Sequence, residues 1–167
     1  MHLRERIEAA FEHRAMPQTL ATIGARLSGD DEDPNWFSGK NWRDLCQDDW
    51  EQHYTAVSFF TPEAFAYYLP SILSLTADGR CNLLVADQII GSLDRSPTIA
   101  YWDDWLTSQF LGLTNEEYEV IKEWLVSLSG SDVGFGGEDG LMRAYETVEL
   151  LQQETSRIEH RDENDSV

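Results

Sequence analysis

Apolar residues recur at helical spacing along most of the chain. Near the amino terminus they stand at i, i+4, i+7 and i+8, as Leu3, Ile7, Ala10 and Phe11, which predicts an amphipathic helix at residues 2–15. The same periodicity predicts helices at 19–27, 42–54, 61–77, 82–94, 114–128 and 141–157. Residues 99–111 fit either a short helix or an extended segment, and we favour the helix. No stretch has the alternation with a period of two that is typical of strands.

Local signals mark two helix starts and one interruption. The hydroxyl of Thr61 can cap free backbone N–H groups, and Pro62 suits the first helical position. Thr114, with Glu117 three residues later, has the pattern of a capping box. Pro70 has no N–H to donate to the carbonyl four residues earlier, so we expect a kink or a break there.

Polar segments separate these predicted helices. Residues 28–41 are predicted to be a polar loop, and residues 129–140, with five glycines, a flexible loop. The polar residues 158–167 are predicted to be a disordered tail. The sequence therefore predicts an all-α fold: a single compact, bundle-like domain of six or seven helices over residues 1–157.

The composition supports a folded core. Of the 167 residues, 41% are hydrophobic and 11% aromatic, including six tryptophans, which argues against disorder. Trp50, Trp105 and Trp124 stand at helical spacing, so we expect them in the core. Trp36 and Phe37 lie in the predicted polar loop and are candidates for exposed binding anchors.

The composition also bears on location. No apolar run approaches the roughly 20 residues that span a bilayer, and the first residues form a charged amphipathic pattern rather than a signal peptide. We therefore expect a cytoplasmic protein. Cys46 and Cys81 are far apart in the sequence and are expected to be free thiols in a reducing compartment.

The charge is strongly and unevenly negative. The chain has 31 Asp and Glu against 12 Lys and Arg, a net charge of −19; residues 1–29 carry +1 and residues 30–167 carry −20. Such a chain repels nucleic acid and anionic membranes and attracts basic partners. An acidic surface can also serve solubility alone, as in salt-loving organisms, and the scarcity of lysine (Lys40 and Lys122) agrees with that alternative.

No pattern of catalytic or metal-binding residues stands out. The four histidines are scattered, and the glycine-rich segment at 132–143 has Arg143 where a calcium loop needs Glu. The glycines at 134–137 are followed by acids rather than by Lys and Ser or Thr, so a phosphate cradle is disfavoured. We predict no catalytic residue, no metal and no cofactor. An enzyme that uses a pair of carboxylates is the least favoured alternative.

Acidic clusters interleaved with aromatic residues suggest a binding surface for a basic protein. Carboxylates would pair with the Arg and Lys of a partner, and Trp would add a buried anchor. A further acidic cluster lies at 116–123. The predicted partner-binding residues are Asp30, Asp31, Glu32, Asp33, Trp36, Asp44, Asp48 and Asp49, with Asp103 and Asp104 as a second patch.

One block resembles a known signature. Residues 58–70, Ser-Phe-Phe-Thr-Pro-Glu-Ala-Phe-Ala-Tyr-Tyr-Leu-Pro, are similar to the hallmark of an uncharacterised bacterial family, a domain of unknown function. Trp42 matches a Trp that precedes this block, and residues 110–117 resemble a later segment that leads into the helix around Trp124. The resemblance covers residues 36–128 and implies no catalytic residues.

Three functions are consistent with these features. By analogy with small acidic bacterial proteins, we favour an immunity-type inhibitor that binds and occludes a basic effector or toxin domain, such as a nuclease. The second hypothesis is a regulatory or scaffolding module whose acidity serves solubility. The third is the enzyme with a carboxylate pair.

Overall fold

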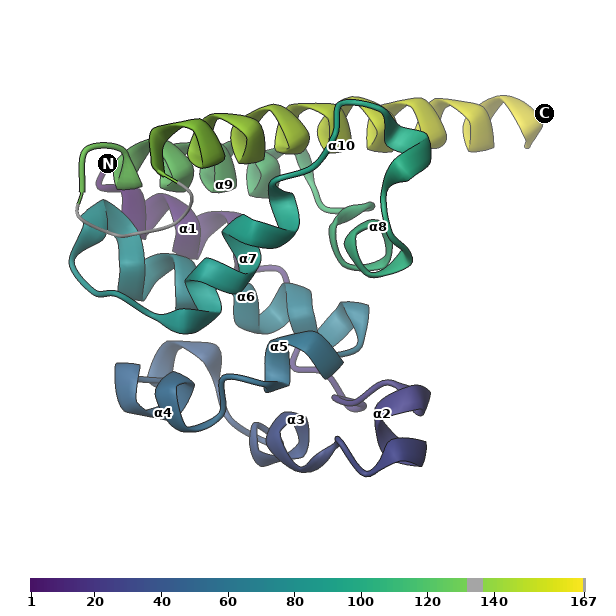
Figure 1. The fold of residues 1–167 in the computed structure, drawn as a ribbon. Helices are drawn as coiled ribbons and strands as arrows, with labels where there is room; N and C mark the ends of the chain where they lie inside the picture. The colour runs from purple at the N-terminus through teal and green to yellow at the C-terminus, as the bar shows by residue number, and fades with distance from the viewer. Residues whose placement is uncertain (132–136, 167) are drawn as a thin grey trace.

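The computed structural model describes residues 1–131 and 137–166, which form helices and no β-strand (Figure 1). The α-helices are α1 (Leu3–Phe11), α2 (Ile23–Ser28), α3 (Glu32–Trp36), α4 (Gln47–Gln52), α5 (Ala56–Phe59), α6 (Pro62–Thr76), α7 (Leu84–Leu93), α8 (Asp104–Phe110), α9 (Asn115–Leu128) and α10 (Gly137–Asp165). Three short 3-10 helices are η1 (Trp42–Asp44), η2 (Ala77–Gly79) and η3 (Ile99–Tyr101). The predicted all-α, bundle-like fold is confirmed.

The helix count is higher than six or seven because short helices were missed. Residues 28–41, predicted to be a loop, contain α3. The predicted helix at 42–54 is split into η1 and α4, because Leu45 and Cys46 are extended. The Asp49 carboxylate accepts a hydrogen bond from the Cys46 backbone N–H (2.9 Å), which fixes a new helix start at this point.

Helix α6 is the centre of the molecule. The Thr61 hydroxyl caps it by accepting a hydrogen bond from the N–H of Ala64 (3.2 Å), as the sequence predicted. Every residue from Ala64 to Leu73 is buried, so the helix is covered on all sides. It runs through Pro70 without a break. Packing against α1, α7 and α8 holds the helix together where the proline removes one hydrogen bond.

The long helices pack around α6. Helix α9 lies beside α10, α1 packs against both α6 and α9, and α7 packs against α10 (Figure 1). The indole N–H of Trp124 donates to the Thr76 hydroxyl (2.9 Å), which joins α9 to the end of α6. Trp50 and Trp124 are fully buried, as predicted, whereas Trp105 is only half-buried against the core.

A partly buried ion pair joins the segment after α1 to the start of α9. The Arg14 guanidinium donates from Nε and Nη2 to the two carboxylate oxygens of Glu117, at 2.7 and 2.6 Å. Glu117 also accepts from the Thr114 N–H (2.7 Å), which completes the predicted capping box. The sequence placed Glu117 in an acidic surface cluster, yet its side chain is fully buried. Here the sequence prediction of a surface position is wrong.

Residues 22–60 form an outer layer, α2 to α5, on one side of α6 (Figure 1). The ring of Phe37 lies at its base, against Trp50, Phe60 and Tyr68, with ring centroids 4.8–5.3 Å apart. The Tyr68 hydroxyl of α6 donates to the carbonyls of Phe37 (2.7 Å) and Lys40 (2.8 Å). These contacts fix the segment that follows α3 and so position the acidic residues on both sides of it.

Helix α10 extends past the body of the molecule (Figure 1). We expected a disordered tail at 158–167, but the helix continues to Asp165. Residues 158–166 are all exposed, so local interactions hold this last part. One is the Ser166 hydroxyl, which donates to the carbonyl of Asp162 (2.7 Å). Residues 132–136, in the predicted glycine-rich loop, and residue 167 lie outside the described part of the chain.

Candidate functional site

The acidic run at 30–33 folds as the start of α3. Asp31 is the N-cap residue, and Glu32 and Asp33 occupy the first turn, where carboxylates face the positive end of the helix dipole. Pro34 is tolerated because an N–H in the first turn has no partner within the helix. The sequence analysis interpreted these acids and Pro34 as part of a loop, whereas in the structure they form the start of α3.

Asp33 is bound within the protein. Its carboxylate contacts His53 Nδ1 (3.0 Å) and accepts a hydrogen bond from the Thr55 hydroxyl. Burial raises the pKa of Asp33, but the hydrogen bonds from Thr55 and His53 and the charge of His53 outweigh it, so the pKa lies below 3.8. Asp33 therefore ties α3 to the segment between α4 and α5 and is not free for a partner.

Trp36 is also packed within the outer layer. Its ring stacks on His53, with centroids 4.0 Å apart, and the Lys40 ammonium lies 4.1 Å from the ring centroid. Trp36 is half-buried, and its neighbour Phe37 is fully buried. The prediction of two exposed anchors is wrong for Phe37, which is a core residue. Only the solvent-facing part of Trp36 can reach a partner.

The remaining acids of the outer layer differ in whether their carboxylates accept hydrogen bonds within the protein. Asp30 accepts from the Ser28 hydroxyl (2.6 Å), Asp31 accepts from the Asn35 amide (3.1 Å), and Asp49 caps α4. Glu32, Asp44 and Asp48 are exposed, and their carboxylates accept no hydrogen bond from the described residues. We call Asp30, Asp31, Glu32, Asp44 and Asp48 the acidic surface.

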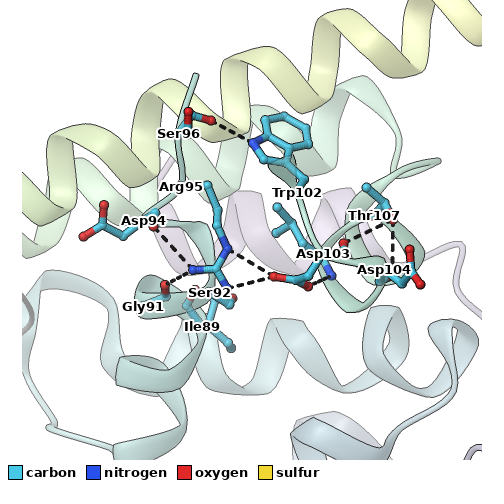
Figure 2. Close-up of polar contacts among 11 residues, drawn as sticks. Ile89, Gly91, Ser92, Asp94, Arg95, Ser96, Trp102, Asp103, Asp104 and Thr107 are labelled. Atoms are coloured by element: carbon cyan, nitrogen blue, oxygen red, sulfur yellow. Dashed lines mark hydrogen bonds and ion pairs between the residues drawn. The ribbon is translucent and has the colours of Figure 1, made fainter. Parts of the chain in front are cut away.

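One of the two acids of the second predicted patch, Asp103, is neutralised by Arg95. The Asp103 carboxylate accepts from the Leu106 N–H (2.8 Å). It also accepts from Nε and Nη2 of Arg95 (3.2 and 3.0 Å), as Figure 2 shows. The hydrogen bond from Leu106 is the main cause that holds the pKa of Asp103 below 3.8, and Arg95 adds to it. Asp104 is exposed, and its carboxylate accepts no hydrogen bond from the described residues; its backbone carbonyl accepts one from the Thr107 hydroxyl (3.2 Å).

Arg95 organises this patch. It also donates to the carbonyls of Gly91 (3.2 Å) and Asp94 (3.4 Å), so it holds the end of α7 against the start of α8 (Figure 2). The Trp102 indole N–H donates to the carbonyl of Ser96 (2.8 Å) and closes the loop between them. In Figure 1, α8 lies apart from α3 and α4, so the two predicted patches do not form one surface.

Three of the four acids in the cluster at 116–123 are paired as well, and Glu116 is exposed with no side-chain partner among the described residues. Glu117 binds Arg14, Glu123 binds Arg6, and Glu119 accepts from Lys122 (2.8 Å). The two arginine pairs could not be identified from the sequence, since the arginines lie more than 100 positions from their partners. Of the acidic clusters found in the sequence, the outer layer therefore keeps the most unpaired carboxylates.

Two negative observations hold for residues 1–131 and 137–166. No group of three His, Cys, Asp or Glu side chains is arranged to hold a metal ion. No helix in this part of the chain is long and apolar enough to cross a membrane. Within the same ranges Cys46 and Cys81 are free thiols.

Asp87 of α7 is a half-buried carboxylate with one oxygen lacking a partner among the described residues. Burial raises its pKa from 3.8 to about 6. The folded protein thus holds this proton more tightly than the unfolded chain. The stabilising contribution is fully present below the unfolded pKa and is lost as the pH rises through the folded pKa.

Replacement of Asp87 by Asn removes this titration. We expect Asp87→Asn to raise the free energy of unfolding by about 1–2 kcal/mol at about pH 8, and by much less at about pH 4. Urea unfolding at both pH values measures the difference, with Glu149→Gln, an exposed carboxylate of α10, as the control. An equal effect of Asp87→Asn at both pH values would contradict the assignment.

The comparisons with known proteins add no relative. No family model, no curated protein and no solved structure matches the chain. The resemblance of residues 36–128 to a bacterial family therefore stays a prediction.

Proposed function

We propose that this protein is a non-enzymatic, immunity-type inhibitor that binds a basic effector or toxin domain through its acidic surface. The carboxylates pair with Arg and Lys side chains that otherwise hold phosphate groups, as in the groove of a nuclease. Inhibition is steric and electrostatic, so no covalent bond is made or broken. Long-range attraction speeds the encounter, and close ion pairs fix the orientation of the complex.

The observation that carries the proposal is the unpaired negative charge of the outer layer. Residues 22–60 hold eight acidic and three basic residues, a net charge of −5. Glu32, Asp44 and Asp48 are exposed, and their carboxylates accept no hydrogen bond within the described chain. In contrast, Asp103, Glu117, Glu119 and Glu123 are paired, which leaves one such exposed carboxylate in each of the other two clusters, Asp104 and Glu116. Such carboxylates can bind a partner's guanidinium groups without first breaking a contact of their own.

The free thiols agree with a cytoplasmic location. Cys46 is exposed and Cys81 half-buried, and neither forms a disulfide within the described residues. An exposed thiol is stable in a reducing compartment and prone to oxidation outside it. We therefore propose that the inhibitor acts in the cytoplasm, where an immunity protein meets its effector.

A second function, a regulatory or scaffolding module, is favoured by one observation. The exposed segment at the end of α10, residues 158–166, carries Glu159, Asp162, Glu163 and Asp165. These side chains do not pack against the core. Acids placed there serve solubility equally well in any protein. A scaffolding module would use such charge without a specific basic partner.

Capture from the native lysate separates these two functions. The tagged protein is loaded at low salt, eluted with a salt gradient, and its partners are identified by mass spectrometry. The inhibitor proposal predicts one basic protein, bound in stoichiometric amount and released as salt screens the ion pairs. A blank, or a broad set of ribosomal proteins, would contradict it and favour the second function.

A further inference from the structure

Helix α2 presents apolar side chains to solvent. Ile23 is 67% exposed and Leu27 is 84% exposed. They stand four residues apart and therefore lie on the same face of the helix. Ala25, on the opposite side, is buried, and Thr22 caps the helix by accepting from its N–H (3.2 Å). The outward face of α2 is thus an apolar helix face without a partner in the described chain.

A tight turn joins this face to the acidic surface. Gly29 ends α2 in the left-handed conformation (φ 85°), and the Asp30 N–H donates to the carbonyl of Ala25 (2.9 Å). The chain then continues into Asp31 and Glu32, so three acids follow Leu27 within five residues. Apolar and acidic groups are therefore contiguous on one edge of the outer layer.

We propose that α2 and this turn form a docking surface for a basic amphipathic segment of the partner. An apolar side chain of the segment packs on Ile23 and Leu27, and flanking Lys or Arg side chains pair with Asp30, Asp31 and Glu32. An apolar centre with a charged rim is the usual arrangement of a protein interface. This inference rests on the proposed function and names the part of the surface where the partner docks.

The charges select this occupant over others. Arg26 contributes one positive charge on α2, so the surface formed with Asp30, Asp31 and Glu32 has a net charge of −2. A second copy of the chain would bring the same acids opposite themselves, within a molecule of net charge −19. An anionic lipid surface is repelled for the same reason. A basic segment is attracted by the acids and covers the apolar pair.

A peptide titration tests the docking surface. The probe is a short synthetic helical peptide of leucine and lysine, added to the full-length ¹⁵N-labelled protein and followed by NMR. A peptide of equal charge that contains lysine alone serves as the comparison. We expect chemical-shift changes concentrated at residues 22–32, and weaker binding of the lysine-only peptide.

Matched variants complete the test. Leu27→Ser is expected to weaken leucine–lysine peptide binding about tenfold, because it removes most of one exposed apolar contact. Val126→Ser, which removes a side chain that is 61% exposed on α9, is the control and is expected to leave binding within about twofold of wild type.

Several results would overturn the inference. They are the absence of saturable binding, equal affinity of Leu27→Ser and wild type, and shift changes that fall outside residues 22–32. Self-association of the wild type that Leu27→Ser abolishes would assign this face to a second copy instead. Shift changes on α4 alone would leave the proposed function standing, whereas that function fails on its own if lysate capture yields no salt-sensitive basic partner.

Discussion

Replacement of Arg14 by Ala is expected to lower the free energy of unfolding by about 3–5 kcal/mol. The change leaves the Glu117 carboxylate buried, with the Thr114 N–H and, at 3.6 Å, His13 as its nearest polar neighbours. A buried charge without its counter-ion loses the attraction that offset its desolvation. Equilibrium urea unfolding at neutral pH measures the change.

The chain offers a matched control for this prediction. Arg6 also lies in the amino-terminal segment and also binds a glutamate of α9, Glu123, but these side chains are 40% and 37% exposed. Arg6→Ala is expected to cost less than about 1 kcal/mol, because water replaces the lost partner. Similar losses for Arg6→Ala and Arg14→Ala would show that the burial of Glu117 adds nothing to the free energy of unfolding beyond what an exposed ion pair contributes.

Replacement of Phe37 by Ala is expected to lower the free energy of unfolding by about 3–5 kcal/mol. The ring is fully buried between Trp50, Phe60 and Tyr68, so its removal opens a cavity at the base of the outer layer. Thermal and urea unfolding measure the loss. If Phe37→Ala does not fold, Phe37→Leu tests the same contact with an expected loss of about 1–1.5 kcal/mol.

Trp36→Ala is the control for this second prediction. Trp36 is adjacent in sequence and larger than Phe37, but it is half-buried, with Lys40 over its ring. We expect a loss of about 1–2 kcal/mol, smaller than that for Phe37→Ala. A larger loss for Trp36→Ala would reverse the assignment of Phe37 as the core residue of this pair.

The main helices could be predicted from the sequence because their signals are local. The apolar periodicity of residues 2–15, the cap at Thr61 and the capping box from Thr114 to Glu117 each depend on residues a few positions apart. The short helices were missed for the same reason. The acids and Pro34 of α3 have a composition that is typical of loops, and only the structure shows that they occupy the first turn of a helix.

The state of each acid could not be predicted from the sequence. Whether Glu117 is a surface charge or half of a buried ion pair depends on Arg14, 103 positions away. Asp33 is held by His53 and Thr55, which are 20 and 22 positions from it. The charge pattern therefore indicated where acids gather, and the fold determines which of them are free to bind.

The affinity of the captured basic partner for two charge-reversed variants shows whether the acidic surface is the binding site. One variant replaces Glu32, Asp44 and Asp48 of the acidic surface by Lys. The other replaces Glu159, Asp162 and Glu163, on the exposed end of α10, by Lys and so makes the same change in net charge. Thermal unfolding verifies that both variants fold.

The acidic-surface variant is expected to bind the partner about a hundredfold more weakly than wild type and to lose most of the salt dependence. The α10 variant is expected to stay within about threefold of wild type, because its charges belong to a different element and not to the acidic surface. Equal losses in the two variants would show that net charge, rather than this surface, attracts the partner, and the proposed binding site would be wrong.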